Sequence, residues 1–184
     1  MADKHPYVSG TGVLVQVLDH LKKSFPANLD AEVLRKLGFA PKNESYILNT
    51  LRFIKLIDEK GARTDTAHKT FTLHDPKSFE KAFSDIVKSA YGDLFKLHGE
   101  DAWTLDNAQL ITYFRQTDQS SELVGTRQAN TYNALVGYAG HGAAPERFQR
   151  RKPSRHQVGS QRRPQNRKRL SATSRMARPS PAEG

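Results

Sequence analysis

The spacing of hydrophobic residues predicts three helices in the first third of the chain. Apolar residues recur every three to four positions over 11–25. A second, shorter helix is expected to begin near Asn28 or Asp30, either of which can cap a first turn, and to end before Gly38. A third helix is predicted over 42–56. The inward positions of these helices are expected to share one core that includes Leu14, Leu18, Leu34, Leu48, Leu51 and Ile54.

The pattern changes after the third helix. Residues 57–73 contain two short apolar runs on either side of Gly61, which predicts a β-hairpin, or wing, with that glycine at its turn. Residues 64–69 are equally compatible with a helical turn. Three helices followed by a hairpin give the element order of a winged helix-turn-helix, in which the third helix can enter the major groove of DNA.

The next part of the chain is expected to be helical throughout. A long helix is predicted over 78–97, although Gly92 within it either costs about 1 kcal/mol relative to Ala or marks a break. Two further helices are predicted over 104–114 and 121–138. We expect the single tryptophan, Trp103, to be buried between this region and the long helix.

Charge divides the chain more sharply than hydropathy does. Residues 1–140 hold 17 Lys and Arg against 17 Asp and Glu, whereas residues 141–184 hold 12 against two. The net charge of +10 therefore belongs to this tail. The tail also has five prolines and one aromatic residue, so it buries too little apolar area to offset its chain entropy and is expected to be disordered. Ten of its basic residues are Arg, a bias that translation of GC-rich DNA in an alternate frame also produces.

Together these features predict a mainly α fold. A winged helix-turn-helix-like N-terminal half over 5–76 is expected to pack on a C-terminal helical half over 77–140, and a disordered basic tail follows over 141–184. The absence of cysteine excludes disulfides and thiol catalysis. A polar N-terminus without a secretory signal, and apolar runs too short for a bilayer, predict a soluble cytoplasmic protein with no membrane partner.

The predicted third helix and wing supply the candidate nucleic-acid-binding residues of the folded part. Ser45, Asn49 and Arg52 share its outward face, and Asn suits adenine while Arg suits guanine. The net charge over 42–69 is only +2, which is small for a DNA-binding surface, so a solvated face of a packing helix is the alternative. Contacts to phosphates are expected from Lys42, Lys55, Lys60, Arg63 and Lys69.

The tail carries the strongest charge signal. Flexible basic segments attract DNA, RNA or acidic surfaces by releasing counterions, without needing a fold. Because Phe148 is its only aromatic residue, such binding should be sensitive to salt and poorly specific. The candidate residues are Arg150, Arg151, Lys152, Arg162, Arg163, Arg167, Lys168 and Arg169.

No pattern in the sequence indicates an enzyme, a metal site or a cofactor. The seven histidines are scattered without helical spacing, so we expect imidazoles on the surface or in loops. The sequence contains neither a phosphate-binding glycine-rich loop nor a nucleophile elbow. An acidic group can in principle hold a divalent cation, but a charged loop beside helix starts is the simpler interpretation of Asp93, Glu100, Asp101 and Asp106.

Several short motifs resemble a bacterial family of domains of unknown function. The motifs are Pro6–Val8, Leu37–Phe39, Leu51–Asp58 and Ala90–Phe95, and the resemblance covers about residues 5–140. It implies a helical domain with a winged-helix-like N-terminal half, and it brings no activity or site residues. These motifs are mostly apolar and small, which indicates shared packing rather than shared chemistry.

We therefore expect a non-enzymatic bacterial DNA-binding protein or regulatory adaptor. Helix 42–56 and wing 57–73 would face DNA, and the tail would add non-specific attraction. The alternative is a protein–protein interaction module with no direct nucleic-acid role, in which the neutral helical surface docks a partner.

Overall fold

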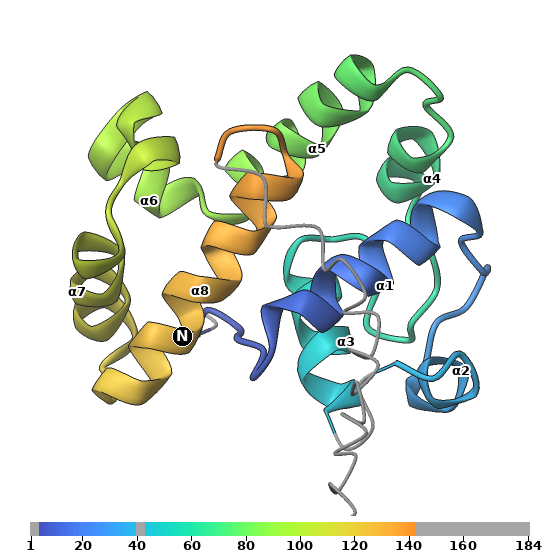
Figure 1. Ribbon diagram of the computed structural model, residues 1–184, viewed down its shortest axis with the longest axis horizontal. Helices are drawn as coiled ribbons and strands as arrows, with labels where there is room; N and C mark the ends of the chain where they lie inside the picture. The colour runs from blue at the N-terminus through green and yellow to red at the C-terminus, as the bar shows by residue number, and fades with distance from the viewer. Residues whose placement is uncertain (1–3, 40–42, 143–184) are drawn as a thin grey trace, which may run out of the picture. The chain divides into compact units, whose positions relative to one another are not determined.

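The computed structural model describes residues 4–39 and 43–142, and these residues form a mainly helical fold (Figure 1). Within them the only β pairing consists of isolated bridges. The helices, in chain order, are α1 Thr11–Lys23, α2 Ala31–Lys36, α3 Glu44–Phe53, α4 Asp65–Phe71, α5 Pro76–Ala90, α6 Gly92–His98, the 3-10 helix η1 Gly99–Thr104, α7 Asn107–Asp118 and α8 Glu122–Tyr138.

Side-chain caps determine where most of these helices begin. Asp30, Thr64, Asp75 and Ser121 each accept a hydrogen bond from the backbone N–H three residues later. Asp106 forms a reciprocal capping box at the start of α7. These contacts satisfy N–H groups that have no partner within the first helical turn. Of the two caps considered for the second helix, Asp30 is the one used.

Helix α8 joins the earlier and later parts of the sequence. It packs against α1, α5 and α7, and it runs between them in Figure 1. Most of its buried residues are small or apolar, such as Ala129, Tyr132 and Leu135, and Gln128 and Thr131 are buried polar residues. The Tyr132 hydroxyl donates to the backbone oxygen of Ala102 at 2.9 Å. A helix that is buried on most sides in this way is typical of the centre of a helical fold.

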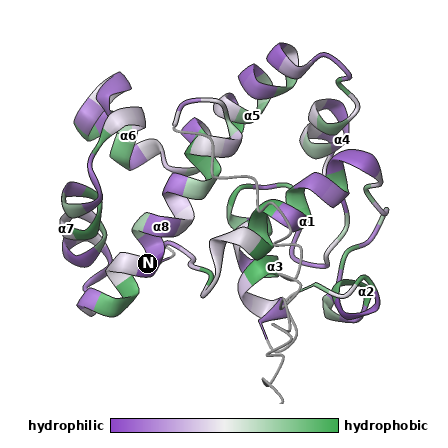
Figure 2. Cartoon of the chain, viewed as in Figure 1, coloured by the Kyte–Doolittle hydropathy of each residue, from purple (hydrophilic) through white to green (hydrophobic). Residues whose placement is uncertain are grey.

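One hydrophobic core extends through all of these helices. Each helix carries both hydrophobic and hydrophilic residues, as expected for helices that cover a common core (Figure 2). None of the helices in the described ranges is long and apolar enough to cross a bilayer. The predicted shared core is confirmed, since it includes Leu14, Leu18, Leu34, Leu48, Leu51 and Ile54, all buried.

The long helix predicted over 78–97 is two helices, so the break is the correct one of the two alternatives for Gly92. Helix α5 ends at Ala90, and α6 begins at Gly92. The buried Tyr91 lies at the joint with φ −99° and ψ 33°, outside the helical region. Trp103 is buried as predicted, and its ring packs edge-to-face against Phe95 of α6, with 4.6 Å between centroids. The helix that contacts Trp103 is therefore α6, which the break at Tyr91 separates from α5.

The structured part continues past residue 140, where periodicity ends in the sequence. His141 stacks on Trp103 with 4.0 Å between ring centroids, and its Nε2 lies 2.9 Å from the hydroxyl oxygen of Ser84. Local hydropathy contains no trace of this stacking contact, and the boundary predicted at residue 141 stays a prediction. The predicted disorder of the following residues lies outside the described part.

Most of the return strand predicted for the wing is helix α4. Thr64 caps this helix, and its buried residues Ala67, Thr70 and Phe71 follow helical spacing rather than strand alternation. The helical interpretation of 64–69 is thus correct. What remains of the hairpin is antiparallel pairing of Ile57 with Arg63, and a second bridge pairs Ala62 with Asn28 between α1 and α2.

Gly61 makes the closest backbone approach in this turn, and replacing it tests the turn directly. Its φ is +85°, and a Cβ at this position would lie 2.5 Å from the Leu29 backbone oxygen. We expect Gly61→Ala to lower the free energy of unfolding by more than about 2 kcal/mol. Gly92→Ala is the control, since its Cβ would meet nothing within 4 Å, and it should change stability by less than about 1 kcal/mol. If the two substitutions lower the free energy of unfolding equally in denaturant titrations, Gly61 does not lie in a turn too tight for a Cβ atom.

Candidate nucleic-acid interface

Helix α3 presents two of the three side chains predicted to face DNA bases. Ser45 and Asn49 are exposed, whereas Ile47 and Leu51 of the same helix are buried. Arg52 is half-buried; its Nη1 donates to Asn49 Oδ1 at 3.2 Å. Its Nε is enclosed without a hydrogen-bond partner among the described residues. The expectation that Arg52 projects outward therefore holds only in part, because the guanidinium is held along the helix beside Asn49.

The basic residues that follow α3 are exposed, but the helix is shorter than predicted. It covers Glu44–Phe53 instead of 42–56. Lys55 follows the helix and adopts a left-handed backbone conformation with φ 56°. Lys60 lies in the next turn, where its backbone N–H donates a 2.8 Å hydrogen bond to the Asp58 carboxylate. Both lysines are exposed and available to contact phosphates. Lys42 lies outside the described residues.

The connection between α2 and α3 is also longer than residues 38–41, which separate the two helices predicted from the sequence. It covers residues 37–43, whereas the turn of a helix-turn-helix usually has three or four residues. Helix α2 nevertheless packs against α3, and Gly38 ends α2 with φ +77°, as its predicted position after the helix requires. Helices α2 and α3 are therefore in contact, with a connection longer than the usual turn of a helix-turn-helix.

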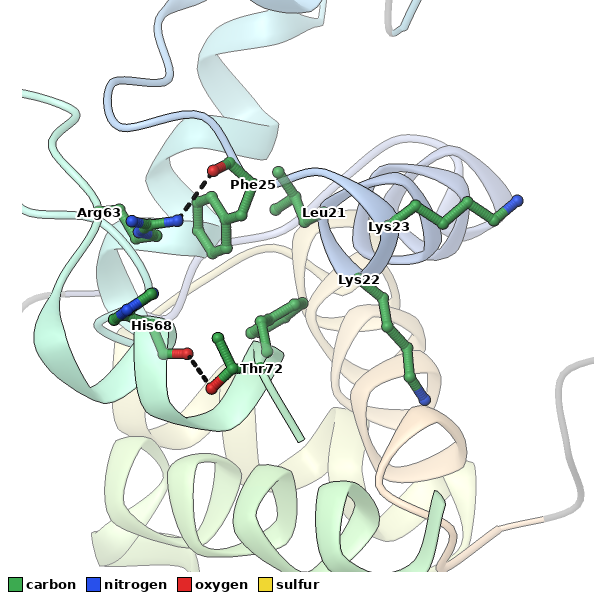
Figure 3. A pocket seen from close by; sticks show the side chains of 8 residues that line it. Leu21, Lys22, Lys23, Phe25, Arg63, His68 and Thr72 are labelled. Atoms are coloured by element: carbon green, nitrogen blue, oxygen red, sulfur yellow. Dashed lines mark hydrogen bonds between the residues drawn. The ribbon is translucent and has the colours of Figure 1, made fainter. Parts of the chain in front are cut away.

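Arg63 lies at a cavity between the end of α1, the loop after it and α4. Its Nη1 donates to the Phe25 backbone oxygen at 2.9 Å, and its guanidinium carbon lies 5.7 Å from the centre of the Phe25 ring. The cavity has a volume of about 160 Å³ (Figure 3). Sequence reasoning assigned Arg63 to the wing because the partner segment is distant along the chain, and it missed the cavity for the same reason.

A buried polar cluster joins the N-terminal segment to the later helices. The Asp118 carboxylate accepts hydrogen bonds from the His5 backbone N–H at 2.9 Å and from Gln128 Nε2 at 2.6 Å. His5 Nδ1 lies 3.0 Å from Asp118 Oδ1. The His5 side chain is 11% exposed, so it is an exception to the expectation of surface imidazoles.

The His5 ring is enclosed by aromatic side chains. It stacks on Tyr91 and meets Phe53, Tyr113 and Phe114 edge-on, with centroid distances of 5.0–6.0 Å. Burial raises the pKa of Tyr91, so this phenol stays protonated at neutral pH. A histidine closed in this way has little access to a substrate. The cluster instead holds the N-terminal segment against α3, α7 and α8.

A partly exposed group of aromatic and basic residues, in which Tyr7 and Arg127 are half-buried, adjoins Ser45 on α3. Tyr46 is 36% exposed, and its ring centre lies 5.2 Å from that of Tyr7. The Arg127 guanidinium carbon lies 5.7 Å from the Tyr7 ring centre. The hydrogen bond with Tyr7 raises the pKa of Tyr46. Tyr and Arg are enriched at binding hot spots, but these three residues are too far apart in sequence to form a recognisable motif.

The acidic residues near η1 form ion pairs and caps rather than a cation site. Asp93 pairs with Lys96 at 2.9 Å. Glu100 pairs with Lys88 and accepts a 3.1 Å hydrogen bond from Trp103 Nε1. The hydrogen bond from Lys88 lowers the pKa of Glu100. Over the ranges that the structure describes, no group of three or more His, Asp or Glu side chains is arranged to hold a metal ion.

The folded residues match a known family along nearly their whole length. The sequence profile of a family of unknown function, DUF5343, matches residues 6–146. The chain belongs to DUF5343. No curated protein and no solved structure matches it.

Membership of DUF5343 separates the candidate residues into two groups. The matched range contains α3, the turn after it, the cavity beside Arg63 and most of the buried polar cluster. The basic tail residues from Arg150 to Arg169 lie beyond the match and outside the described residues. The family match therefore covers the helical domain, and the role of the tail stays a prediction for this chain.

Proposed function

We propose that this DUF5343 protein is a non-enzymatic DNA-binding protein or regulatory adaptor. Helix α3 and the turn over 58–61 would orient the domain on DNA, and the basic tail would supply most of the affinity. The observation that carries the proposal is the pairing that surrounds α3. Asn28, between α1 and α2, pairs with Ala62, and Ile57, after α3, pairs with Arg63. This order of pairing supports a winged-helix arrangement with a very short wing.

The exposed side chains of α3 have the chemistry that base recognition needs. The Asn49 amide can donate and accept hydrogen bonds at an adenine edge, and the Ser45 hydroxyl can do so at several bases. Lys55 and Lys60 follow closely in sequence, and both are exposed. Few cations surround this face, and residues 1–140 are formally neutral. Non-specific affinity must then come chiefly from the tail, because it depends on the number of phosphates neutralised.

The test compares the full chain with residues 1–146, which end where the family match ends. Binding to a random DNA duplex is measured by fluorescence anisotropy at 50 and 200 mM salt. The full chain should lose about a thousandfold in affinity between these salts if it neutralises six or more phosphates. Residues 1–146 should bind more weakly and with a shallower salt dependence. Asn49→Ala in the shorter protein should reduce its binding further, and Asp85→Ala on α5 is the control.

Two outcomes would contradict parts of the proposal. Equal affinity of the two proteins would eliminate the tail as the source of attraction. The absence of binding by residues 1–146, even at low salt, would remove α3 as a DNA-contacting element.

The second candidate function is a protein–protein interaction module, and the group formed by Tyr7, Tyr46 and Arg127 favours it. If this function is correct, residues 1–146 bind no duplex, and Tyr46→Ala weakens binding to a protein partner. The product of a neighbouring gene is the first partner to examine by calorimetric titration. Ser45→Ala is the matched control, because Ser45 is adjacent but contributes little apolar area.

A further inference from the structure

The cavity beside Arg63 is lined by cationic and neutral side chains only. Its ionisable residues are Lys22, Lys23, Arg63 and His68, and no carboxylate lines it. Residues 1–140 contain as many acidic as basic residues, so this local excess of positive charge is not a consequence of composition. A concave site with this charge favours an anion.

Arg63 is held in position before any ligand arrives. Its backbone N–H donates to the Ala27 oxygen at 2.8 Å, and its Nη1 donates to the Phe25 oxygen at 2.9 Å. A guanidinium has five N–H donors, so most of them are left for another acceptor. Arg63 forms no ion pair with any acidic residue in the described part of the chain.

The other three basic side chains that line the cavity differ in their position relative to it. In Figure 3, His68 lies on the same side as Arg63, whereas Lys23 extends away from the cavity. The Lys22 ammonium lies 3.9 Å from the centre of the Phe79 ring, which keeps this charge close to the protein surface. The direct contacts would therefore come from Arg63 and His68, and Lys22 would contribute at longer range.

We propose that this cavity binds a phosphate group, with Arg63 as its principal contact and His68 as its second. The volume of about 160 Å³ is smaller than the 300–1,000 Å³ typical of sites for drug-sized ligands, and it suits one small anion. The fork of a guanidinium matches two phosphate oxygens. Two sources can supply this group: a free phosphate or phosphomonoester, and the DNA backbone. For the DNA backbone, the inference rests on the proposed function.

The test follows the backbone amide resonances of residues 61–72 in the full chain by NMR, which separates this site from the basic tail. Inorganic phosphate is titrated at constant ionic strength, with chloride as the reference anion. We expect saturable shifts at Arg63 and His68. Arg63→Gln should weaken binding about tenfold, as expected for loss of a charged hydrogen bond. Lys81→Gln removes an exposed charge on α5 that does not line the cavity, and it should leave the phosphate affinity unchanged.

His68→Asn provides a second variant in case Arg63→Gln disturbs the turn. His68 is exposed, so its replacement should preserve the fold and still weaken phosphate binding measurably. The proposal is overturned if phosphate shifts these resonances no more than chloride does. It is also overturned if the affinity of both variants equals that of the unaltered protein.

A second titration with a random DNA duplex identifies the source of the phosphate. Shifts at Arg63 and His68 that both variants reduce would assign the site to the DNA backbone. If inorganic phosphate binds but the duplex leaves these resonances unchanged, the cavity is a site for free phosphate or a phosphomonoester, and this inference stands without the DNA-binding function. If the duplex binds the full chain while neither ligand shifts residues 61–72, the inference fails and the proposed function survives.

Discussion

Replacing Asp118 with Ala should lower the free energy of unfolding by about 3–5 kcal/mol. The Asp118 side chain is 4% exposed, and its carboxylate accepts hydrogen bonds from the His5 backbone and the Gln128 amide. The substitution removes the acceptor of the His5 backbone N–H and one of the two acceptors of Gln128 Nε2, which keeps its 2.6 Å hydrogen bond to the His5 backbone oxygen. An N–H group left without an acceptor in a buried position incurs a desolvation cost. The measurement is chemical denaturation followed by circular dichroism.

The control for this prediction is Asp85→Ala. Asp85 is an exposed carboxylate of α5, and its side chain makes no hydrogen bond within the described ranges, so its loss should change stability by less than about 0.5 kcal/mol. His5→Ala and the double variant complete a thermodynamic cycle. Because His5 and Asp118 are in contact, the double variant should lose less stability than the sum of the single losses. Strictly additive losses would show that the two residues do not act as one network.

Local patterns in the sequence predicted most of the helices but few of the contacts between them. The periodicity of α1, α3 and α8 was sufficient because each helix has a continuous apolar side. The break between α5 and α6 was only one of two alternatives predicted for Gly92, because Tyr91 is apolar enough to continue the hydrophobic stripe of a single long helix. The cap at Thr64 is a weak signal, since the apolar residues around it also fit a strand.

In the candidate site too, the sequence predicted which short side chains of α3 are exposed but not which contacts the long side chains make. Helical spacing correctly predicted that Ser45 and Asn49 are exposed, because short side chains follow the direction of their Cα–Cβ bonds. Long side chains do not have to follow it, and Arg52 bends back toward Asn49. Arg63 binds the oxygen of a residue 38 positions earlier, and His5 binds one 113 positions later. No local pattern predicts contacts at such separations.

These long-range contacts explain how the N-terminal segment and α3 are fixed relative to the rest of the domain. His5 contacts Phe53 at the end of α3 as well as Tyr113 and Phe114 of α7. The Val8 backbone N–H donates to the Thr131 hydroxyl of α8 at 3.0 Å. The exposed face of α3 is therefore oriented by buried groups in the helices that follow it. A loss of binding after a core substitution must accordingly be compared with the loss of stability.

Leu51→Ala is the substitution that tests this dependence, and it should cost about 2–5 kcal/mol. Leu51 lies on α3 and is fully buried, so truncation leaves a cavity between α3 and the helices packed against it. Leu37→Ala is the control, because Leu37 is 38% exposed and its truncation should cost less than about 1 kcal/mol. Denaturant titration measures both. A cost below about 1 kcal/mol for Leu51→Ala would contradict the role of α3 as a core helix.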